Sequence, residues 1–510
     1  MIGAGVGGLA AAIRLAAAGL SVTLIEAQAQ PGGKMRCLPS QVGPVDAGPT
    51  VLTLRGVFDD LFAAAGERLE DHLTLLPQPL LARHWWPDGS RLDLFSDPAQ
   101  SGTAIAAFAG ARAEAEFHRF NRQSAQLYAA FDAPMMRAAR PDLAAIALNA
   151  LRAPAIWPAL APGRSLAAHL AGQFADPRLR QLFGRYATYV GGAPALSPAV
   201  LALIWQAEAR GVWAVQGGMG QLAQALAGLA LRLGVTLRLG TAARRILSRA
   251  GRVREVVLSD GRAMPCDAVV FNGDPAALTA GLLGNGPQLA LAASASHPRS
   301  LSAWVWSFAA MPQGADLLHH NVFFGRDPTQ EFGPIARGQM PLDPTLYVCA
   351  QDRAGHGPAP TGMERFEIIM NAPARSTLSP HEVAECKART FPQLARFGLS
   401  FDPAPPDRAL MTPQGFAALF PGSQGALYGR SPQGMLASFL RPGARTRLKG
   451  LYLAGGGVHP GPGVPMAALS GRHAAETILS DLTSAPSWPR AAMRGGMSMV
   501  SRLTGRVPSR

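Results

Sequence analysis

The sequence predicts an α/β fold of two or more domains, and three observations support this prediction. Residues 2–26 read as a glycine-rich turn, a helix and a strand, which is the order of a β-α-β unit. A buried strand at 450–454 runs into further glycines and a helix from about Ala467. Alternating apolar strands that suggest an antiparallel sheet lie at 304–308, 346–348 and 366–370. A chain of 510 residues can bury a core for each of two domains.

The first of these stretches opens on a G-x-G-x-x-G turn that begins at Gly3. Gly3 permits the tight turn, Gly5 lets the backbone approach a pyrophosphate, and Gly8 lets the helix and strand pack closely. The helix N-terminus offers free N–H groups and a partial positive charge to phosphates. The turn therefore predicts a dinucleotide site.

The rest of the unit supports this prediction. A helix is expected from Leu9 to Ala18 and should stop at Gly19, and a strand is expected from Ser21 to Ile25. Glu26 follows that strand. Its carboxylate can accept hydrogen bonds from both ribose hydroxyls of a bound dinucleotide. Only two residues precede Gly3, whereas a strand of about five is usual. Either the true start lies upstream, or the first strand is unusually short and stability suffers.

Further elements follow along the chain. A hairpin is expected after Trp85, with its turn at Asp88-Gly89, and a second around Asp260-Gly261. The apolar spacing from Leu179 to Val190 predicts one helix face. A helix after Gly220 carries leucines at helical spacing, and a strand over 235–239 follows it.

The composition is apolar and basic. Hydrophobic residues make up 48%, charged residues 16%, and the net charge is +14. Lysine occurs only at 34, 387 and 449, so arginine carries nearly all the positive charge. A basic surface could attract anionic lipid headgroups, or the arginine content could simply reflect genome composition. The absence of basic-aromatic interleaving and of a helix-turn-helix pattern argues against nucleic acid.

Segments that place the protein in a compartment or bind a metal are not evident. The longest uncharged stretch, 275–296, is interrupted by Gly and Pro, so no membrane span is predicted. The N-terminus enters the nucleotide motif directly and shows no signal peptide, which favours a cytoplasmic protein. The four cysteines are scattered without metal-ligand spacing, so they are expected to be free thiols and no metal is predicted.

The residues after Glu26 resemble the ExxxxxGGK/R-R extension of flavoprotein oxidases and desaturases, which holds FAD rather than NAD. Here the extension comprises Gly32, Gly33, Lys34 and Arg36. The resemblance implies that these residues and Glu26 bind FAD.

Three later segments resemble the same families. Residues 45–50 resemble a DAGPT segment that passes close to the flavin, which implies cofactor contacts from Gly48, Pro49 and Thr50. Residues 269–275 resemble a VVxNADP segment, with Gly273 where Ala is usual. This match implies roles for Asn272 and Asp274.

The third segment is at 453–466, and it lacks the Asp that many FAD enzymes place there, as carotenoid desaturases also do. Gly456 and Gly457 would let the backbone approach an FAD phosphate. The resemblance implies that Val464, Pro465 and Met466 lie beneath the flavin ring at a helix N-terminus.

Together these segments resemble the phytoene-desaturase-type carotenoid oxidoreductases, from residue 2 to about residue 480. The resemblance implies a Rossmann-like FAD-binding domain of the GR2 flavoprotein type, with an inserted α+β substrate domain built on an antiparallel sheet. The FAD-binding domain is expected at 1–75, 215–275 and 445–484, and the substrate and membrane-associating domain at 76–214 and 276–444. A basic tail at 485–510 is expected to be flexible, or alternatively to contact a membrane surface.

Within the family, four segments resemble the branch that introduces a C3–C4 double bond into 1-hydroxycarotenoids. These segments are residues 46–66, 83–98, 185–219 and 453–471. The resemblance implies an FAD-dependent enzyme of carotenoid biosynthesis, which removes a hydride from C4 and a proton from C3. Oxygen or a quinone would then reoxidise the flavin. Because carotenoids dissolve in lipid, the protein is expected to lie peripherally on the inner face of a membrane.

Two residues are weak candidates for the base that takes the C3 proton. Glu208 lies in the expected substrate domain, although a helix-surface carboxylate is its simpler interpretation. His459 lies in the glycine-rich third segment, where a histidine is more often a structural hydrogen-bonding residue.

Three alternatives remain open from the sequence. A phytoene desaturase or another carotenoid desaturase or isomerase would share every motif. An amine oxidase would share the nucleotide segments, but no matching Cys-flavin attachment or aromatic cage is evident. An isoprenoid-binding protein of the same fold would perform no redox chemistry, and the intact FAD motifs argue against it.

Overall fold

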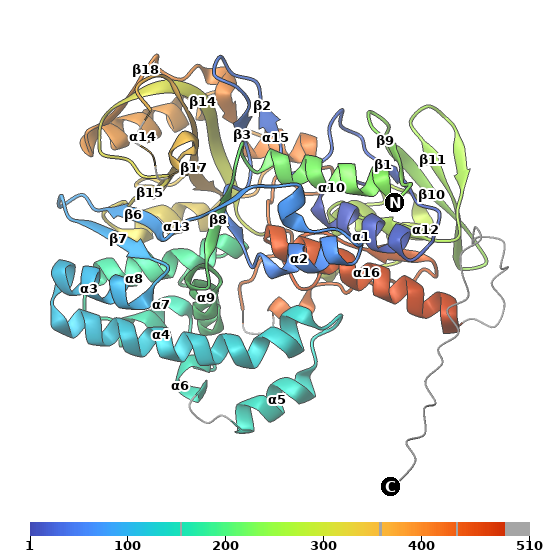
Figure 1. Ribbon diagram of the computed structural model, residues 1–510, viewed down its shortest axis with the longest axis horizontal. Helices are drawn as coiled ribbons and strands as arrows, with labels where there is room; N and C mark the ends of the chain where they lie inside the picture. The colour runs from blue at the N-terminus through green and yellow to red at the C-terminus, as the bar shows by residue number, and fades with distance from the viewer. Residues whose placement is uncertain (153–155, 356, 358–359, 435–436, 485–510) are drawn as a thin grey trace, which may run out of the picture.

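A computed structural model describes residues 1–152, 156–355, 357, 360–434 and 437–484. The predicted tail at 485–510 lies outside the described residues. Figure 1 shows two lobes side by side, with α1, α10 and α16 in one and β14, β17 and α14 in the other. The chain passes between the lobes several times.

The first lobe is built on a small parallel sheet. Strand β1 (Thr23–Ile25) pairs with β9 (Thr236–Arg238), and β13 (Val269–Phe271) pairs with β20 (Leu451–Leu453). Ile2 joins the two pairs, because it forms parallel bridges to both Ile25 and Phe271. Ile2 therefore lies at the centre of this sheet.

Four helices pack on one side of this parallel sheet: α1 (Val6–Ala17), α2 (Gly56–Ala63), α10 (Gly220–Arg232) and α16 (Val464–Ser484). The predicted helices at 9–18 and after Gly220 and the predicted strands at 21–25 and 235–239 are confirmed, with ends shifted by at most three residues. Helices α1 and α16 lie in close contact, since a Cβ added at Gly471 would stand 2.3 Å from the carbonyl oxygen of Gly7. Small residues at this crossing let the two helix N-termini approach the same space.

A three-stranded antiparallel ribbon extends from this lobe. It consists of β10 (Ala243–Arg249), β11 (Arg252–Leu258) and β12 (Ala263–Pro265). The hairpin predicted around Asp260-Gly261 joins β11 to β12, whereas β10 was not predicted. The short helices α11 (Pro275–Thr279) and α12 (Asn285–Gln288) follow β13.

The second lobe contains an eight-stranded sheet with the order β18-β14-β17-β16-β15-β6-β7, and β19 pairs beside β14. Its strands are β6 (Leu80–Trp85), β7 (Arg91–Phe95), β14 (Ser302–Gly314), β15 (His320–Phe323), β16 (Leu346–Ala350), β17 (Glu364–Ala372), β18 (Leu399–Asp402) and β19 (Leu410–Met411). The hairpin predicted after Trp85 is β6–β7.

The expectation of an antiparallel sheet is wrong at one position, because β15 and β6 run parallel. These two strands come from separate visits of the chain to the lobe, so no hairpin dictates their relative direction. The sheet buries Trp304, Trp306 and Phe366 on the face covered by α14 (Glu382–Arg396). Its opposite face carries Ala303, Val305 and Ile369 among others and borders a cavity.

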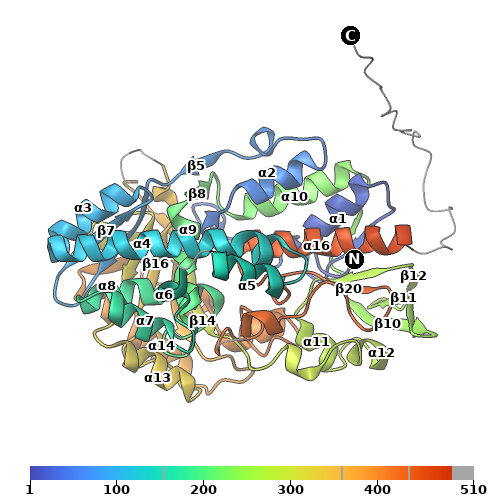
Figure 2. The same cartoon turned by 90° about the horizontal axis from the view of Figure 1, so that it is seen from below.

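A layer of helices completes the second lobe, as Figure 2 shows from below. It contains α3 (Pro98–Ala109), α4 (Ala111–Phe131), α5 (Leu143–Arg152), α6 (Trp157–Leu160), α7 (Leu166–Gln173), α8 (Pro177–Gly184) and α9 (Trp205–Ala209). Helix α13 (Pro328–Ala336) lies between β15 and β16 in the chain, and α15 (Pro413–Leu419) follows β19.

The continuous helix predicted from Leu179 to Val190 is wrong in its second half. Helix α8 ends at Gly184, and Arg185–Val190 forms a 3-10 helix. In a 3-10 helix the side chains at i and i+3 line up. Tyr186 and Tyr189 accordingly pack with ring centroids 5.1 Å apart.

Two small sheets join the lobes. Strand β8 (Val212–Val215) pairs with both β4 (Leu52–Thr53) and β5 (Leu75–Pro77), and β2 (Cys37–Leu38) pairs with β3 (Val45–Asp46). Within the described residues, no helix combines the length and apolar character needed to cross a bilayer.

Candidate active site

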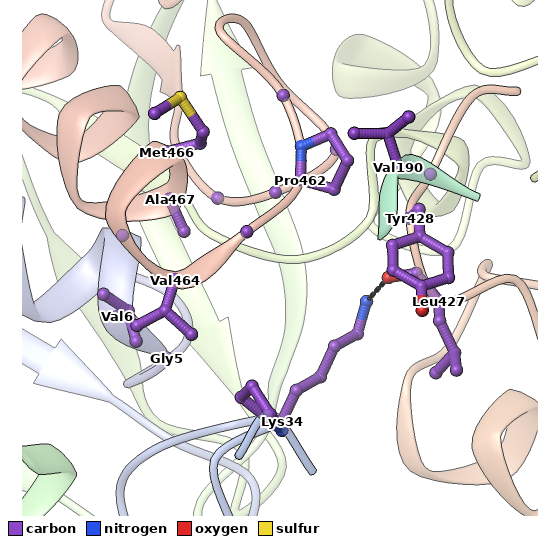
Figure 3. A pocket seen from close by; sticks show the side chains of 18 of the residues that line it. Gly5, Val6, Lys34, Val190, Leu427, Tyr428, Pro462, Val464, Met466 and Ala467 are labelled. Atoms are coloured by element: carbon purple, nitrogen blue, oxygen red, sulfur yellow. Dashed lines mark hydrogen bonds between the residues drawn. The ribbon is translucent and has the colours of Figure 1, made fainter. Parts of the chain in front are cut away.

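A large cavity of about 1090 Å³ lies between the two lobes. Its walls include the glycine-rich turn after Ile2, the N-terminus of α16, and the inner face of the eight-stranded sheet. Figure 3 shows Lys34 reaching across part of this cavity, between the loop that carries Val464 and the segment of Leu427 and Tyr428. All predicted cofactor-binding residues except Gly8 line the cavity.

The first turn has the geometry that the motif predicts. Gly3 adopts a φ of +97°, which suits glycine, and a Cβ on Gly8 would stand 2.1 Å from the Gly3 carbonyl oxygen. Gly8 therefore packs helix against strand and does not reach the cavity. Gly5 precedes α1 and its backbone lines the cavity, where the α1 N-terminus has no side-chain cap. The uncapped amides are available to an anion.

Glu26 is buried at the edge of the parallel sheet, and its carboxylate is already hydrogen-bonded to the backbone. One oxygen accepts from the Ala4 N–H at 2.7 Å and the other from the Gln28 N–H at 2.8 Å. Each carboxylate oxygen has further acceptor capacity for a ribose hydroxyl. The carboxylate thus also ties the glycine turn to the strand.

The two cations of the extension lie on the cavity wall. Lys34 donates to the Leu427 carbonyl and lies 5.4 Å from the Phe420 ring centroid. Its exposed surface faces the cavity rather than bulk water, and this desolvation lowers the pKa of Lys34 to about 8. The Nε of Arg36 is buried without a hydrogen-bond partner among the described residues.

The segment at 46–50 runs along the cavity beside this extension. A Cβ on Gly48 would stand 1.9 Å from the Lys34 carbonyl oxygen, so only glycine fits there. Thr50 donates to or accepts from the Tyr347 hydroxyl at 2.7 Å, which links the segment to β16 of the second sheet. The segment connects the two lobes at the cavity.

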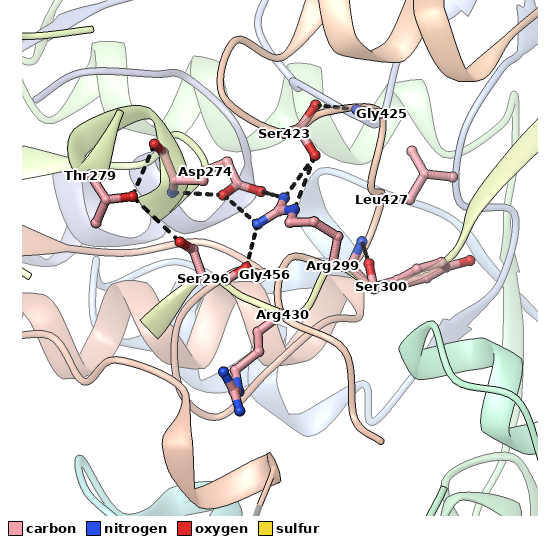
Figure 4. A network of polar contacts seen from close by, with 12 residues as sticks. Asp274, Thr279, Ser296, Arg299, Ser300, Ser423, Gly425, Leu427, Arg430 and Gly456 are labelled. Atoms are coloured by element: carbon pink, nitrogen blue, oxygen red, sulfur yellow. Dashed lines mark hydrogen bonds and ion pairs between the residues drawn. The ribbon is translucent and has the colours of Figure 1, made fainter. Parts of the chain in front are cut away.

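Asn272 and Asp274 hold the cavity wall together. The Asn272 amide donates to the Gly3 carbonyl at 3.2 Å. Asp274 accepts from the Ala276 N–H at 2.9 Å, where it caps α11, and forms an ion pair with Arg299 at 2.5 Å. Figure 4 shows that Arg299 also donates to the Ser423 carbonyl, so these contacts tie three distant segments together.

The third segment supplies the opposite wall. Gly456 and Gly457 lead from β20 toward α16, and the Gly456 carbonyl accepts from Arg441 at 3.3 Å. Helix α16 begins at Val464, three residues earlier than predicted. Val464 and Met466 therefore lie at a helix N-terminus that borders the cavity (Figure 3).

These features fit FAD. The walls include two helix N-termini for negative charge, glycine backbones without side chains, a buried carboxylate for a ribose, and a buried Arg36 nitrogen that needs an acceptor.

The cavity continues beyond this region into an apolar part. Its walls there comprise Phe131, Met135, Ile146, Trp157, Leu160, Val305, Ile369 and Phe416. The first five belong to α4–α6 or the turn that follows α4, and the others to β14, β17 and α15. Such walls suit a long apolar molecule rather than a small polar one.

The structure places only one of the two candidate bases at the cavity. Glu208 is buried, lines the cavity, and accepts from the Tyr186 hydroxyl at 2.7 Å. It is therefore not the helix-surface carboxylate that the simpler interpretation suggested. His459 does not line the cavity, and its Nε2 lies 2.9 Å from the Ala138 carbonyl oxygen.

The sequence reasoning missed Glu367, a second carboxyl group in the cavity wall. It is fully buried on β17, and neither carboxyl oxygen has a hydrogen-bond partner among the described residues. Burial, with Asp46 as the next contribution, raises the pKa of Glu367 well above its usual value. A glutamate inside the apolar run Phe366–Met370 was the available signal.

Comparisons with known proteins agree with this geometry. The profile of a family described as "Flavin containing amine oxidoreductase" matches residues 6–479. The chain is 64% identical over 484 residues to a hydroxyneurosporene desaturase of Cereibacter sphaeroides, which covers 95% of this chain and 98% of the relative. It is 57% identical to a hydroxyneurosporene desaturase of Rhodobacter capsulatus, with the same coverage of both chains.

A solved structure shares the fold. A mutant of putrescine oxidase, described as a redesign of cofactor binding, superposes with a TM-score of 0.60 over 94% of this chain and 98% of the other. The sequence identity is 16%, so this likeness concerns the fold alone.

Proposed function

The chain belongs to the flavin containing amine oxidoreductase family and is an FAD-dependent oxidoreductase, and we propose that it desaturates 1-hydroxycarotenoids between C3 and C4. The observation that carries the proposal is the continuity of one cavity, from the glycine turn at Gly5 to the apolar walls of α4–α6. A polyene can thereby lie along the apolar part with one end beside the cofactor.

The reaction removes two hydrogens from neighbouring carbons. Bound FAD supplies the acceptor for the hydride that leaves C4. The resulting positive charge spreads along the conjugated chain of the substrate, so the protein does not have to stabilise a localised cation. The C3–H bond then breaks, its electron pair forms the C3=C4 double bond, and a base takes the proton.

The cavity walls perform two tasks in this scheme. They orient the polyene, because Val305, Ile369 and Phe416 leave it little freedom beside the cofactor region. They also exclude water, which would otherwise trap the cation. Reoxidation by oxygen or a quinone completes the cycle.

Glu208 is the better placed of the two predicted bases. It lines the cavity, and Tyr186 holds its carboxylate in position. Glu367 is a poorer base because its raised pKa favours the protonated carboxyl group at neutral pH.

Replacing Glu208 with Gln should lower kcat by about 10²- to 10⁴-fold, as is typical for loss of a general base. An unchanged kcat would remove Glu208 from this role.

The decisive experiment offers two substrates. The purified protein is incubated anaerobically with 1-hydroxyneurosporene or with phytoene, each in separate liposomes, and products are separated by chromatography. Desaturation of the hydroxylated substrate supports the proposal, whereas desaturation of phytoene alone overturns it. Absence of flavin absorbance in the purified protein would instead favour an isoprenoid-binding protein.

We also propose that the protein takes its substrate from a membrane surface. Exposed apolar side chains, Leu148, Leu151 and Trp157, lie on α5 and α6 beside the cavity wall. Exposed arginines, Arg140 and Arg152, flank them and would meet anionic headgroups. The mouth of the apolar part of the cavity would then face the lipid.

Vesicle flotation tests this second proposal. The protein is expected to float with anionic vesicles at low salt, and to a lesser extent at high salt, because screening weakens the arginine contacts. Replacement of Leu151 and Trp157 with Ser should weaken flotation at both salt concentrations. Absence of flotation under either condition contradicts the proposal.

A further inference from the structure

A second cavity, of about 160 Å³, lies beside the main one. Both cavities are lined by Thr50, which belongs to the segment predicted to pass close to the flavin. The walls of the smaller cavity also include His319 and Cys349, together with the carboxylates of Asp46 and Asp352. His320 follows His319 in the chain without lining this cavity, and the desaturation scheme uses neither histidine nor the thiol.

The sheet register explains how these residues meet. Ser307 on β14 pairs with Glu367 on β17, Glu367 pairs with Cys349 on β16, and Cys349 pairs with His320 on β15. Directly paired residues project from the same face of a sheet. A row of four polar side chains therefore crosses four strands, and His319 immediately precedes β15.

Three members of this row carry polar atoms that have no hydrogen-bond partner among the described residues. The Ser307 hydroxyl, both oxygens of Glu367 and Nε2 of His320 are buried without a hydrogen bond to any described residue. Buried polar groups in proteins are nearly always satisfied. These groups therefore remain available to a bound species, and Glu367 also lines the main cavity.

The histidines and Cys349 stand close enough to share one ion. A ring nitrogen of His319, a ring nitrogen of His320 and the Cys349 Sγ all lie within 4.8 Å of one another, and all three residues are buried. In a tetrahedral zinc site, ligand atoms lie about 3.3–3.6 Å apart, as bond lengths of about 2.0 Å to nitrogen and about 2.3 Å to sulfur require. Side-chain rotations that move the ligand atoms by up to about 1.5 Å would close the difference.

Hydrogen bonds already orient both imidazoles. Nδ1 of His319 lies 2.8 Å from the Ala350 carbonyl oxygen, so it carries a proton and donates. Nδ1 of His320 lies 2.7 Å from the Tyr347 hydroxyl. Histidine ligands of metals usually donate their other ring N–H to such a group, which leaves Nε2 for the metal.

We propose that His319, His320 and Cys349 bind a divalent cation of borderline softness, with zinc as the best match. Two imidazoles and one thiolate are typical zinc ligands, and the smaller cavity leaves room for water in the fourth position. On binding, the Cys349 S–H bond breaks, the sulfur binds the metal, and the proton passes to solvent. No oxidation or reduction takes place.

Two acidic residues line the same smaller cavity. A divalent ion with one thiolate carries a net single positive charge, and Asp46 and Asp352 lie on the wall of that cavity. The ion would also hold His320, and through Tyr347 it would hold the Thr50 side chain at the main cavity. The proposed role is structural: it fixes the segment between the lobes.

Metal analysis of the purified holoenzyme tests the proposal. After expression in zinc-supplemented medium and desalting, the protein should retain about one zinc per chain. X-ray absorption at the zinc edge should show sulfur at about 2.3 Å and nitrogen at about 2.0 Å. A strong chelator should remove the metal and lower the melting temperature, and added zinc should restore it. These readouts do not depend on desaturase activity.

Variants identify the ligands. Cys349→Ser and His320→Gln should each lower the zinc content by about tenfold or more. Cys386→Ser, at a second buried cysteine on α14, is the matched control and should retain zinc. The proposal is overturned if wild-type protein holds no zinc after reconstitution, if the absorption spectrum shows no sulfur ligand, or if Cys349→Ser binds zinc as wild type does.

Discussion

At the scale of single residues, glycines of the first turn have different roles. Gly8 is required by packing, because a Cβ there would meet the Gly3 carbonyl oxygen at 2.1 Å. Gly5 adopts φ −71° and ψ 173°, which any residue can adopt, and a Cβ there would meet the Asn272 amide at 3.0 Å. The backbone conformation therefore admits a side chain at Gly5 if the Asn272 amide shifts by a few tenths of an ångström, and we expect the cofactor to be what excludes it.

Replacing Gly5 with Ala should separate cofactor binding from folding. We expect FAD affinity to fall by about tenfold or more, because the methyl group occupies the approach to the pyrophosphate. The stability of the FAD-free protein should change by less than about 1 kcal/mol. Gly172→Ala, inside α7 with open space around it, is the control and should leave FAD affinity unchanged. Flavin fluorescence measures the FAD affinity, and thermal unfolding measures the stability of the FAD-free protein. An unchanged FAD affinity, or a loss of stability well above about 1 kcal/mol, would contradict the prediction.

Lys34 should make FAD binding dependent on pH. Desolvation in the cavity lowers its pKa to about 8, so the FAD-free protein loses this charge above that pH. An anionic cofactor favours the charged lysine and raises its pKa, so binding takes up a proton in the window above pH 8. Affinity should thus be constant below about pH 8 and fall as pH rises above it.

Titration of the FAD-free protein with FAD at several pH values checks this prediction. The Lys34→Met variant should bind more weakly at pH 7 and lose the decline above pH 8. The exposed Lys387 pairs with Asp407 far from the cavity, and Lys387→Met should behave as wild type. If the FAD affinity of Lys34→Met still falls above pH 8, another titrating group causes the pH dependence.

At the scale of elements, Asp46 holds helix α10 in place across more than 170 residues of chain. Its carboxylate accepts from the Met219 N–H at 2.6 Å and the Gly220 N–H at 3.1 Å, at the start of that helix. Gly218, with φ +99°, makes room for it, since a Cβ there would lie 2.5 Å from a carboxylate oxygen. The helix has no side-chain cap of its own.

Asp46→Asn should destabilise the protein by about 2 kcal/mol, because an amide can accept at only one atom and leaves a buried N–H unsatisfied. The midpoint of urea unfolding should fall accordingly. Asp71→Asn, at an exposed aspartate, is the control and should change the stability by less than about 0.5 kcal/mol. A midpoint unchanged in Asp46→Asn would show that the cap contributes little.

At the scale of the whole molecule, Arg299 and Asp274 join segments from different visits of the chain. Both side chains are more than nine-tenths buried, and Arg299 also donates to the Ser423 carbonyl at 2.9 Å (Figure 4). Removing one partner of a buried ion pair leaves an uncompensated charge. This pair is therefore expected to matter far more than the many exposed pairs.

Arg299→Met should cost about 3–5 kcal/mol of stability, measured by urea unfolding with flavin and tryptophan signals. Lys387→Met, which breaks the exposed pair with Asp407, should cost less than about 1 kcal/mol. The double variant Arg299→Met/Asp274→Asn should recover part of the loss, because no lone charge remains buried. An equal loss of unfolding free energy in Arg299→Met and Lys387→Met would show that burial does not make the first ion pair more important.

Much of the candidate cofactor site could be predicted from the sequence, because its residues serve local geometry. A turn that needs φ +97° at Gly3, or that leaves 2.1 Å for a Cβ at Gly8, admits few alternatives, so the pattern shows in the sequence. The helix and strand that follow depend on contacts within about twenty residues. The family, FAD and the mixed α/β class followed from such segments.

The remaining features required the tertiary structure, because they depend on strand register and on contacts between distant segments. The parallel pairing of β15 with β6, the 3-10 helix at Arg185–Val190 and the burial of Glu208 follow from packing across the chain. Cysteine spacing predicted no metal site, since His320 and Cys349 come from two strands and meet only through their register. The sequence alone determined the cofactor chemistry, whose geometry is local. The tertiary structure decided which carboxylates, histidines and thiol face a cavity, because those positions depend on residues hundreds of places apart.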